Sequence, residues 1–218
     1  MRFPAAVSTT SVQSRRAFTL IELLVVIAII AVLVGLLFSG FRAVQDQAKR
    51  TQAKNDLAQI VTAVNAFYTE YGKYPIVAAD TTYGPGGASS ADLFYALRAV
   101  PSGLNAANAI NPRQIVFISP PDVKIPAIPV SGIGTTTGVG QYYDPWGTAY
   151  AIRIDGDYNN SVANPYGPQA TGGAGSDPVP LGVIAWSLGS DKLLGTTGDN
   201  IYKNPTTGAQ SDDVISWQ

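Results

Sequence analysis

The sequence predicts an α+β fold in which one long N-terminal helix, with a membrane half and an amphipathic half, packs against a small antiparallel β-sheet. Three observations carry this prediction. No proline interrupts residues 18–74, where apolar residues follow helical spacing. Nearly all of the 22 glycines and 15 prolines lie beyond residue 71. Short runs of β-branched and aromatic residues alternate with those turn residues, as in a small sheet with many loops.

Residues 1–17 form a short basic leader without an acid, and the segment 18–41 is expected to be a transmembrane helix. No charge occurs from Leu23 to Phe41. At about 1.5 Å per residue this run would be roughly 28 Å long, close to the ~30 Å hydrocarbon core of a bilayer. The alternative is a helix buried in a soluble core, which is disfavoured because the run is apolar on all faces.

Residues 42–75 continue the helix with an amphipathic pattern. Gly72 and Pro75 predict its end, so we expect one helix over residues 18–71. A stripe of this kind needs a second layer to cover it. Apolar residues at spacings of three and four form the stripe: Ala53, Leu57, Ile60, Val61, Val64, Phe67, Tyr68 and Tyr71.

The composition excludes several kinds of site. The chain has no cysteine and no histidine, which rules out disulfides, thiolate catalysis, zinc sites built on these residues and imidazole acid–base chemistry. The formal net charge is −1 and only 13% of residues are charged, so no nucleic-acid partner is expected. No nucleophile-elbow, phosphate-loop or paired-carboxylate motif occurs, and we expect a protein that is not an enzyme.

Glu22 is an acid near the start of the apolar segment. A charge at the centre of a membrane helix costs about 2.5 to 3.5 kcal/mol, and less near an end. If the chain were cut between Ala17 and Phe18, the new amino group would lie four residues before Glu22. The amino group of a neighbouring copy could then neutralise this carboxylate among apolar helices. The alternative is a carboxylate that simply lies at headgroup level.

The segment Arg16–Ile30 (RAFTLIELLVVIAII) resembles the class III leader of type IV prepilins and type II secretion pseudopilins. The resemblance implies that prepilin peptidase cleaves after Ala17, that Phe18 becomes the N-methylated terminus, and that Glu22 is the docking acid for assembly. Ala17 departs from the glycine usual before the cut. Ser14–Phe18 also resembles a twin-arginine export signal, but Glu22 and the long apolar run disfavour that alternative.

The remaining chain is expected to be a loop-rich insertion at 76–141 followed by a C-terminal sheet at 142–218. In the insertion we predict a helix over residues 91–100 and a strand over 114–119, and we interpret residues 131–140 as a low-complexity loop. Three further strands are predicted, which would cover the apolar stripe of the long helix: 148–154, 181–188 and 214–217.

The C-terminal part resembles one branch of the same family. Asp144–Tyr150 (DPWGTAY) resembles the D-P-W-G-x-P-Y stretch of the G-type major pseudopilin of type II secretion, although Ala149 replaces the usual proline. Ser187–Asp191 and the later Asp199 resemble that family's calcium loop, and a closing acidic pair follows. The resemblance implies a bound Ca²⁺ with these candidate ligands: Asp191, Asp199, Asp212 and Asp213.

Calcium prefers six to eight oxygen ligands, which aspartates and free carbonyls on turn-rich segments can supply. Ordinary solvated turn aspartates are the alternative. A second acidic run, Asp155–Asn160, begins like an EF-hand loop. Its sixth and twelfth positions are Asn160 and Tyr166 rather than Gly and Glu, so we interpret it as a hairpin turn.

The resemblance implies a structural subunit of a type II secretion pseudopilus, a periplasmic helical filament that helps export folded proteins. The implied location is the bacterial inner membrane, crossed once, with the C-terminal domain in the periplasm. The implied partners are further copies of the chain as a homopolymer, prepilin peptidase, the inner-membrane assembly platform, minor pseudopilins and a separate cytoplasmic ATPase. Two alternatives stay open: a type IV major pilin for adhesion or motility, and a singly anchored periplasmic binding or carbohydrate-processing protein.

Overall fold

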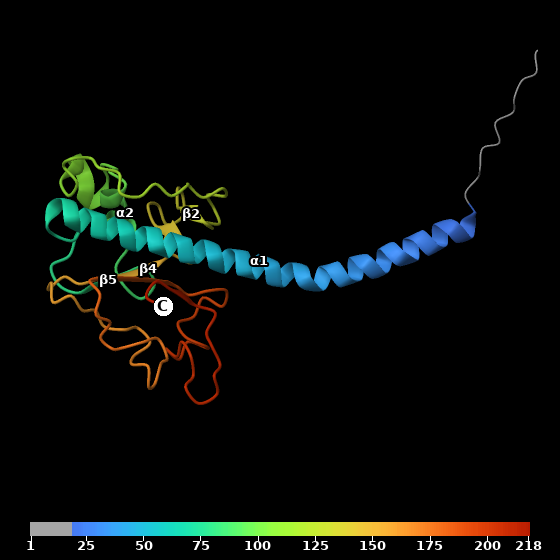
Figure 1. The fold of residues 1–218 in the computed structure, drawn as a ribbon. Coiled ribbons are helices and arrows are strands. Elements are labelled where there is room, and N and C mark those ends of the chain that lie inside the picture. Colours follow the sequence, from blue (N-terminus) through green and yellow to red (C-terminus); the bar gives the residue numbers. More distant parts are fainter. Residues whose placement is uncertain (1–18) are drawn as a thin grey trace, which may run out of the picture. The chain divides into compact units, whose positions relative to one another are not determined.

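The computed structural model describes residues 19–218, except for the side chains at 36–40. Its main helix, α1 (Leu20–Tyr71), confirms the predicted helix over residues 18–71 from Leu20 onward. The chain divides into two compact units, Met1–Gln45 and Asp46–Gln218, and α1 contributes to both (Figure 1).

The described part of the first unit is helical. Every side chain from 19 to 35 is exposed, and nearly all of them are apolar. Among the described residues, no helix combines the length and apolarity needed to cross a membrane. The membrane segment expected at 18–41 therefore stays a prediction.

The second unit contains a four-stranded antiparallel sheet that confirms the three C-terminal strand predictions in shorter form. The strand order is β1-β4-β5-β6. Register is fixed by pairs such as Ile152 with Ala185 in β4 and β5. The bounds of the strands are β1 Thr81–Tyr83, β4 Ala151–Ile154, β5 Val183–Ser187 and β6 Val214–Ile215.

The insertion contributes more to the sheets than its sequence indicates. β1 comes from this segment and pairs with β4. A second, two-stranded sheet joins β2 (Gly132–Ile133) to β3 (Tyr142–Tyr143), so the interpretation of residues 131–140 as loop alone is wrong. Strands of two or three residues are too short to show an alternating pattern, which explains why the sequence did not predict them.

The predicted strand over 114–119 is wrong, because the structure has no strand there. Gln114 has a positive φ of 55°, which an extended strand does not accommodate. The N–H groups of Phe117 and Ile118 both donate to the carbonyl oxygen of Leu97, at the end of α2 (Ala91–Leu97). The segment therefore closes the end of α2, which was predicted over 91–100, and follows a short 3₁₀ helix, η1 (Gly103–Asn108).

Apolar residues cover both faces of the main sheet. On one face the predicted stripe of α1, including Leu57 and Phe67, packs with Ile152 of β4 and Phe94 of α2. On the other face Trp186 of β5 lies in a second cluster built largely from loops. Alternate residues of β4 and β5 enter the two clusters, as the pleat of a strand requires.

Candidate functional site

Glu22 lies in the first turn of α1, where its carboxylate is bonded to Thr19. The carboxylate oxygen Oε2 accepts hydrogen bonds of 2.8 Å from both the backbone N–H and the hydroxyl of Thr19, and the N–H of Glu22 donates back to that hydroxyl at 3.3 Å. This is a capping box, which the T-x-x-E pattern of the sequence could have indicated. Ala17 and Phe18, the predicted processing residues, lie outside the described residues.

Three of the four predicted metal ligands come together. Asp191, Asp212 and Asp213 each offer a carboxylate oxygen, and these oxygens lie within 4.8 Å of one another. Asp212 accepts hydrogen bonds from the backbone N–H groups of Ser190 and Asp191, which holds the loop after β5 against the segment before β6.

Asp213 is the most informative member of this group. The residue is only 2% exposed, and its Oδ2 accepts hydrogen bonds of 2.8 Å from the Tyr166 hydroxyl and from the Gly195 N–H. Its Oδ1 is buried without a hydrogen-bond partner among the residues described. Burial raises the pKa of Asp213 to about 6, although both donors act in the opposite direction.

Asp199, the fourth predicted ligand, is absent from the group. Its Oδ1 accepts hydrogen bonds from the N–H groups of Thr196 and Ile201, at 2.9 and 3.0 Å, and its Oδ2 accepts one from the Thr196 hydroxyl at 2.6 Å. These bonds, led by the hydroxyl, lower the pKa of Asp199. Its observed contacts are those of a carboxylate that caps a turn within the loop.

The three clustered carboxylates provide some of the oxygen ligands that a hard cation requires. Calcium takes carboxylate oxygens readily, and a buried carboxylate oxygen without a partner is the feature that ordinary turn aspartates lack. Asp191, Asp212 and Asp213 would hold the ion, and it would supply the missing partner of Asp213 Oδ1.

Asp144 connects the two C-terminal motifs. Its side chain is fully buried, where Oδ1 accepts hydrogen bonds from the N–H groups of Trp146 and Thr148, at 2.9 and 2.8 Å. The hydroxyl of Ser187, at the end of β5, donates to Oδ2 at 2.5 Å. Burial raises the pKa of Asp144 despite these bonds. The DPWG segment is thus a turn fixed by its own aspartate and linked directly to the start of the candidate calcium loop.

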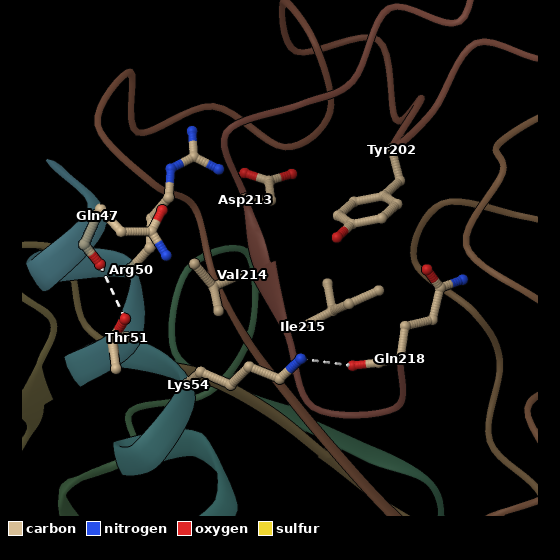
Figure 2. A pocket seen from close by; sticks show the side chains of 9 residues that line it. All are labelled: Gln47, Arg50, Thr51, Lys54, Tyr202, Asp213, Val214, Ile215 and Gln218. Carbon is tan, nitrogen blue, oxygen red and sulfur yellow. Dashed lines mark hydrogen bonds between the residues drawn. The ribbon is translucent and has the colours of Figure 1, made fainter. Parts of the chain in front are cut away.

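A pocket between α1 and β6 was missed by the sequence analysis. It has a volume of about 190 Å³ and is lined by two basic side chains of α1, Arg50 and Lys54, together with polar groups near the C-terminus (Figure 2). The basic residues lie one turn apart on the helix, a spacing readable from sequence. That the predicted strand over 214–217 lies beside them is not readable from sequence.

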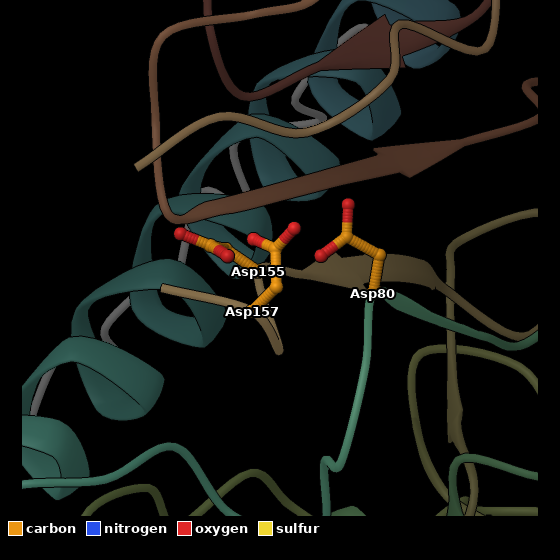
Figure 3. Close-up of side chains that lie close together, drawn as sticks. All are labelled: Asp80, Asp155 and Asp157. Carbon is orange, nitrogen blue, oxygen red and sulfur yellow. The ribbon is translucent and has the colours of Figure 1, made fainter. Parts of the chain in front are cut away.

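A second acidic group was also not predicted, because the sequence analysis did not place its three members together. Asp80, Asp155 and Asp157 bring carboxylate oxygens within 4.8 Å of one another (Figure 3). Both oxygens of the buried Asp155 accept backbone N–H bonds, from Asn159 and Asn160. The run is a turn as predicted, yet it is not the tip of a hairpin, because β4 pairs only with the distant β1 and β5.

Comparison with known proteins finds one family match and two similar curated proteins. Residues 13–38 match the family described as the prokaryotic N-terminal methylation motif. The type IV major pilin protein PilA of Myxococcus xanthus is 36% identical over 70 residues, which are 32% of this chain and 32% of PilA. The type II secretion system core protein G of Klebsiella michiganensis is 32% identical over 63 residues, which are 29% of this chain and 44% of that protein.

The methylation motif and the two relatives support a type IV pilin-like or pseudopilin family for this chain. The similar segment covers 32% of PilA and 44% of core protein G, well under two thirds of either relative, and it makes up less than a third of this chain in both comparisons. No solved structure matches it significantly. The long helix packed on a small antiparallel sheet agrees with the fold that the family resemblance implied.

Proposed function

We propose that this pilin-like chain is a structural subunit of a helical filament, held in the bacterial inner membrane before assembly. The observation that carries the proposal is the N-terminal methylation motif at residues 13–38, which contains Glu22. Prepilin peptidase cuts between Ala17 and Phe18 and the new terminus is methylated. Segment 18–41 anchors the subunit, with residues 42–218 in the periplasm.

Glu22 favours the assembled state over the single copy in the membrane. In a single copy its carboxylate is bonded only by Thr19 of the same turn, among the residues described. The Phe18 amino group of a neighbouring copy carries a positive charge, which a hydroxyl and an N–H group do not. An opposite charge in an apolar bundle offsets the cost of desolvating the carboxylate, so contact between copies is favoured over the isolated helix in lipid.

The first candidate for the filament is the pseudopilus of type II secretion. It is supported by the similarity to core protein G and by the buried Asp144, whose bonds to Trp146 and Ser187 join the two pseudopilin-like motifs. In this role the filament acts with an assembly platform, minor pseudopilins and a cytoplasmic ATPase.

The second candidate is a type IV pilus. It is favoured by the similarity to PilA, which is higher in identity and longer than the similarity to core protein G. Both candidates share the processing, anchoring and assembly steps given above.

Calcium is proposed as a structural ligand of the second unit, bound by Asp191, Asp212 and Asp213. The unpartnered Oδ1 of Asp213 supports this assignment. These residues lie in the loop after β5 and in the segment before β6. That loop buries little apolar surface, and an ion bound to all three residues would fix its conformation. Asp199 then stabilises the loop through its turn rather than as a ligand.

Mass spectrometry of the chain isolated from membranes and from filaments tests the function. We expect a mature terminus at N-methyl-Phe18 in both. An intact Met1 in filaments would overturn the proposal. Two measurements separate the candidates. Loss of secreted folded proteins when the gene for this chain is deleted supports the pseudopilus. Filaments on the cell surface, with secretion unchanged by the deletion, support the pilus.

A further inference from the structure

The turn that follows β4 contains the three-residue pattern Asn159–Ser161 (NNS). Asparagine, then any residue except proline, then serine or threonine is the acceptor pattern for N-linked saccharides, which are attached to surface loops of exported proteins. The pattern occurs once in the sequence. Asn204–Thr206 (NPT) differs from it by a middle proline, which fixes φ and excludes that asparagine. Because so short a pattern arises by chance in many chains, its place in the structure decides what it can do.

The pattern lies on the surface of the second unit. All four residues from 157 to 160 are exposed, and Ser161 is half-buried. The next residue, Val162, is buried in the second apolar cluster. The side chain of Asn159 is therefore within reach of a transferring enzyme, and the rest of the turn leads directly back into the fold.

The buried Asp155 fixes the base of this turn (Figure 3). Its Oδ1 accepts a hydrogen bond of 3.3 Å from the N–H of Asn159, and its Oδ2 accepts one of 2.6 Å from the N–H of Asn160. Tyr158 and Asn160, on either side of Asn159, have positive φ angles of 61° and 59°, so the chain turns sharply at this point. These bonds use the backbone of Asn159, and its side chain is not needed to hold the turn.

The side-chain amide of Asn159 is bonded to another exposed group. Its Nδ2 donates a 2.9 Å hydrogen bond to Oδ2 of Asp157, which lies on the same turn. A hydrogen bond between two exposed groups is replaced by water or by an enzyme at little cost, because both partners stay solvated. Nδ2, the atom that bonds the sugar in an N-linked saccharide, is thus accessible.

Aromatic rings beside the acceptor offer a surface on which a sugar can pack. The ring of Tyr158 is stacked on that of Tyr74, with centroids 5.7 Å apart and an interplanar angle of 13°, yet Tyr158 is 48% exposed. Tyr68, which is 40% exposed, is stacked on the same Tyr74 ring at 4.7 Å. The C–H groups of a sugar pack on aromatic faces as apolar groups do. A saccharide on Asn159 would cover this exposed aromatic surface.

We propose that Asn159 accepts an N-linked saccharide once residues 42–218 lie in the periplasm. Nδ2 of Asn159 forms a bond to the anomeric carbon of the sugar, and the bond from that carbon to the diphosphate oxygen of its carrier breaks. The carrier leaves with the bonding electron pair, and a proton passes from Nδ2 to a base of the transferring enzyme. The donor is a saccharide linked through diphosphate to a membrane lipid, because a periplasmic turn of an anchored chain is reached from the membrane.

This inference rests on the proposed function, which places the turn in the periplasm, and it adds one feature to the filament. A saccharide is bulky and strongly hydrated, so it does not fit into a close contact between copies. The surface around Asn159 and Tyr158 therefore faces outward in the filament.

Mass spectrometry of the full chain isolated from native membranes tests the proposal. Cleavage after Arg153 and Lys192 gives one peptide of residues 154–192, which contains the whole turn. We expect this peptide to carry the mass of a saccharide, and electron-transfer fragmentation should place that mass on Asn159. The peptide that begins at Asn204 is an internal control and should carry no such mass.

Matched variants separate the pattern from its position. Asn159→Gln and Ser161→Ala should each remove the added mass completely, because each destroys the pattern. Asn160→Gln and Ser161→Thr should keep it, because both retain the pattern at the same place in the turn.

The other outcomes contradict the inference or the proposed function separately. An unmodified Asn159 in the wild-type chain would overturn the inference, and the proposed function would stand if the same chains begin at N-methyl-Phe18. A saccharide on Ser161, or one that persists in Ser161→Ala, would also overturn it. A saccharide on Asn159 in filaments whose subunits keep Met1 would support the acceptor site and overturn the proposed processing.

Discussion

The two parts of α1 differ in how far their apolar side chains are buried and in which groups donate hydrogen bonds to their acids. Along residues 53–67 the apolar stripe is buried, and the one acid within it, Asp56, accepts a 2.8 Å hydrogen bond from the hydroxyl of Tyr150. Along residues 19–35 every side chain is exposed, and within the described part of the chain Glu22 is bonded only by Thr19 of its own turn. The first part is covered by its own chain, whereas the described residues leave the second part uncovered.

Matched truncations in the two parts of α1 should differ most. Leu57→Ala removes a fully buried side chain, so the free energy of unfolding should fall by about 2 to 5 kcal/mol. Leu33→Ala makes the same change at a side chain that is 54% exposed, and should shift this free energy by less than about 0.5 kcal/mol. Denaturant titration of the full chain in detergent measures both. Equal losses of unfolding free energy in the two variants would contradict this difference between the two parts of α1.

Asp213 extends the comparison, since only one of its two oxygens is satisfied within the chain. Calcium at 100 times its dissociation constant should stabilise the chain by about 2.7 kcal/mol, seen as a higher melting temperature. Asp213→Asn should abolish the response, whereas Asp155→Asn should keep it, because both oxygens of Asp155 already have partners. A wild-type chain that does not respond would refute the calcium proposal.

Tyr150→Phe tests the hydrogen bond to Asp56, an acid of α1 that has a partner within the chain. The change leaves the buried Asp56 carboxylate without its bonded hydroxyl, which should cost about 1 to 3 kcal/mol of unfolding free energy. Asp56→Asn combined with Tyr150→Phe should be less destabilising than the sum of the two changes. Additive effects in this double-mutant cycle would mean that the hydrogen bond contributes nothing.

The pH dependence of the calcium-free chain should show the effect of Asp213. Burial raises its pKa in the folded state from 3.8 to about 6, so the folded chain holds this proton more tightly than the unfolded chain. Its contribution to the unfolding free energy is complete below pH 3.8 and is lost as pH rises through about 6. Urea titrations from pH 4 to 7 should find a smaller decrease in Asp213→Asn than in the wild type.

The long helix and the C-terminal strands could be predicted because each has a period that depends only on neighbouring residues. Leu57 and Phe67 fall on one helical face whatever they contact. The acidic groups could be predicted only in part. Asp212 and Asp213 are adjacent in sequence, but Asp80 joins Asp155 only through the pairing of β1 with β4. Asp199 was assigned as a ligand by resemblance, and its bonds to Thr196 show a local role that spacing alone does not reveal.

Filament assembly by Glu22→Ala is the most direct test of the central claim, that a neighbouring copy supplies the partner of this acid. The variant should be processed and remain in the membrane, yet form no filaments. Thr19→Ala is the matched control, because it removes the local hydroxyl while keeping the carboxylate, and it should still assemble. Normal filaments from Glu22→Ala would contradict the account.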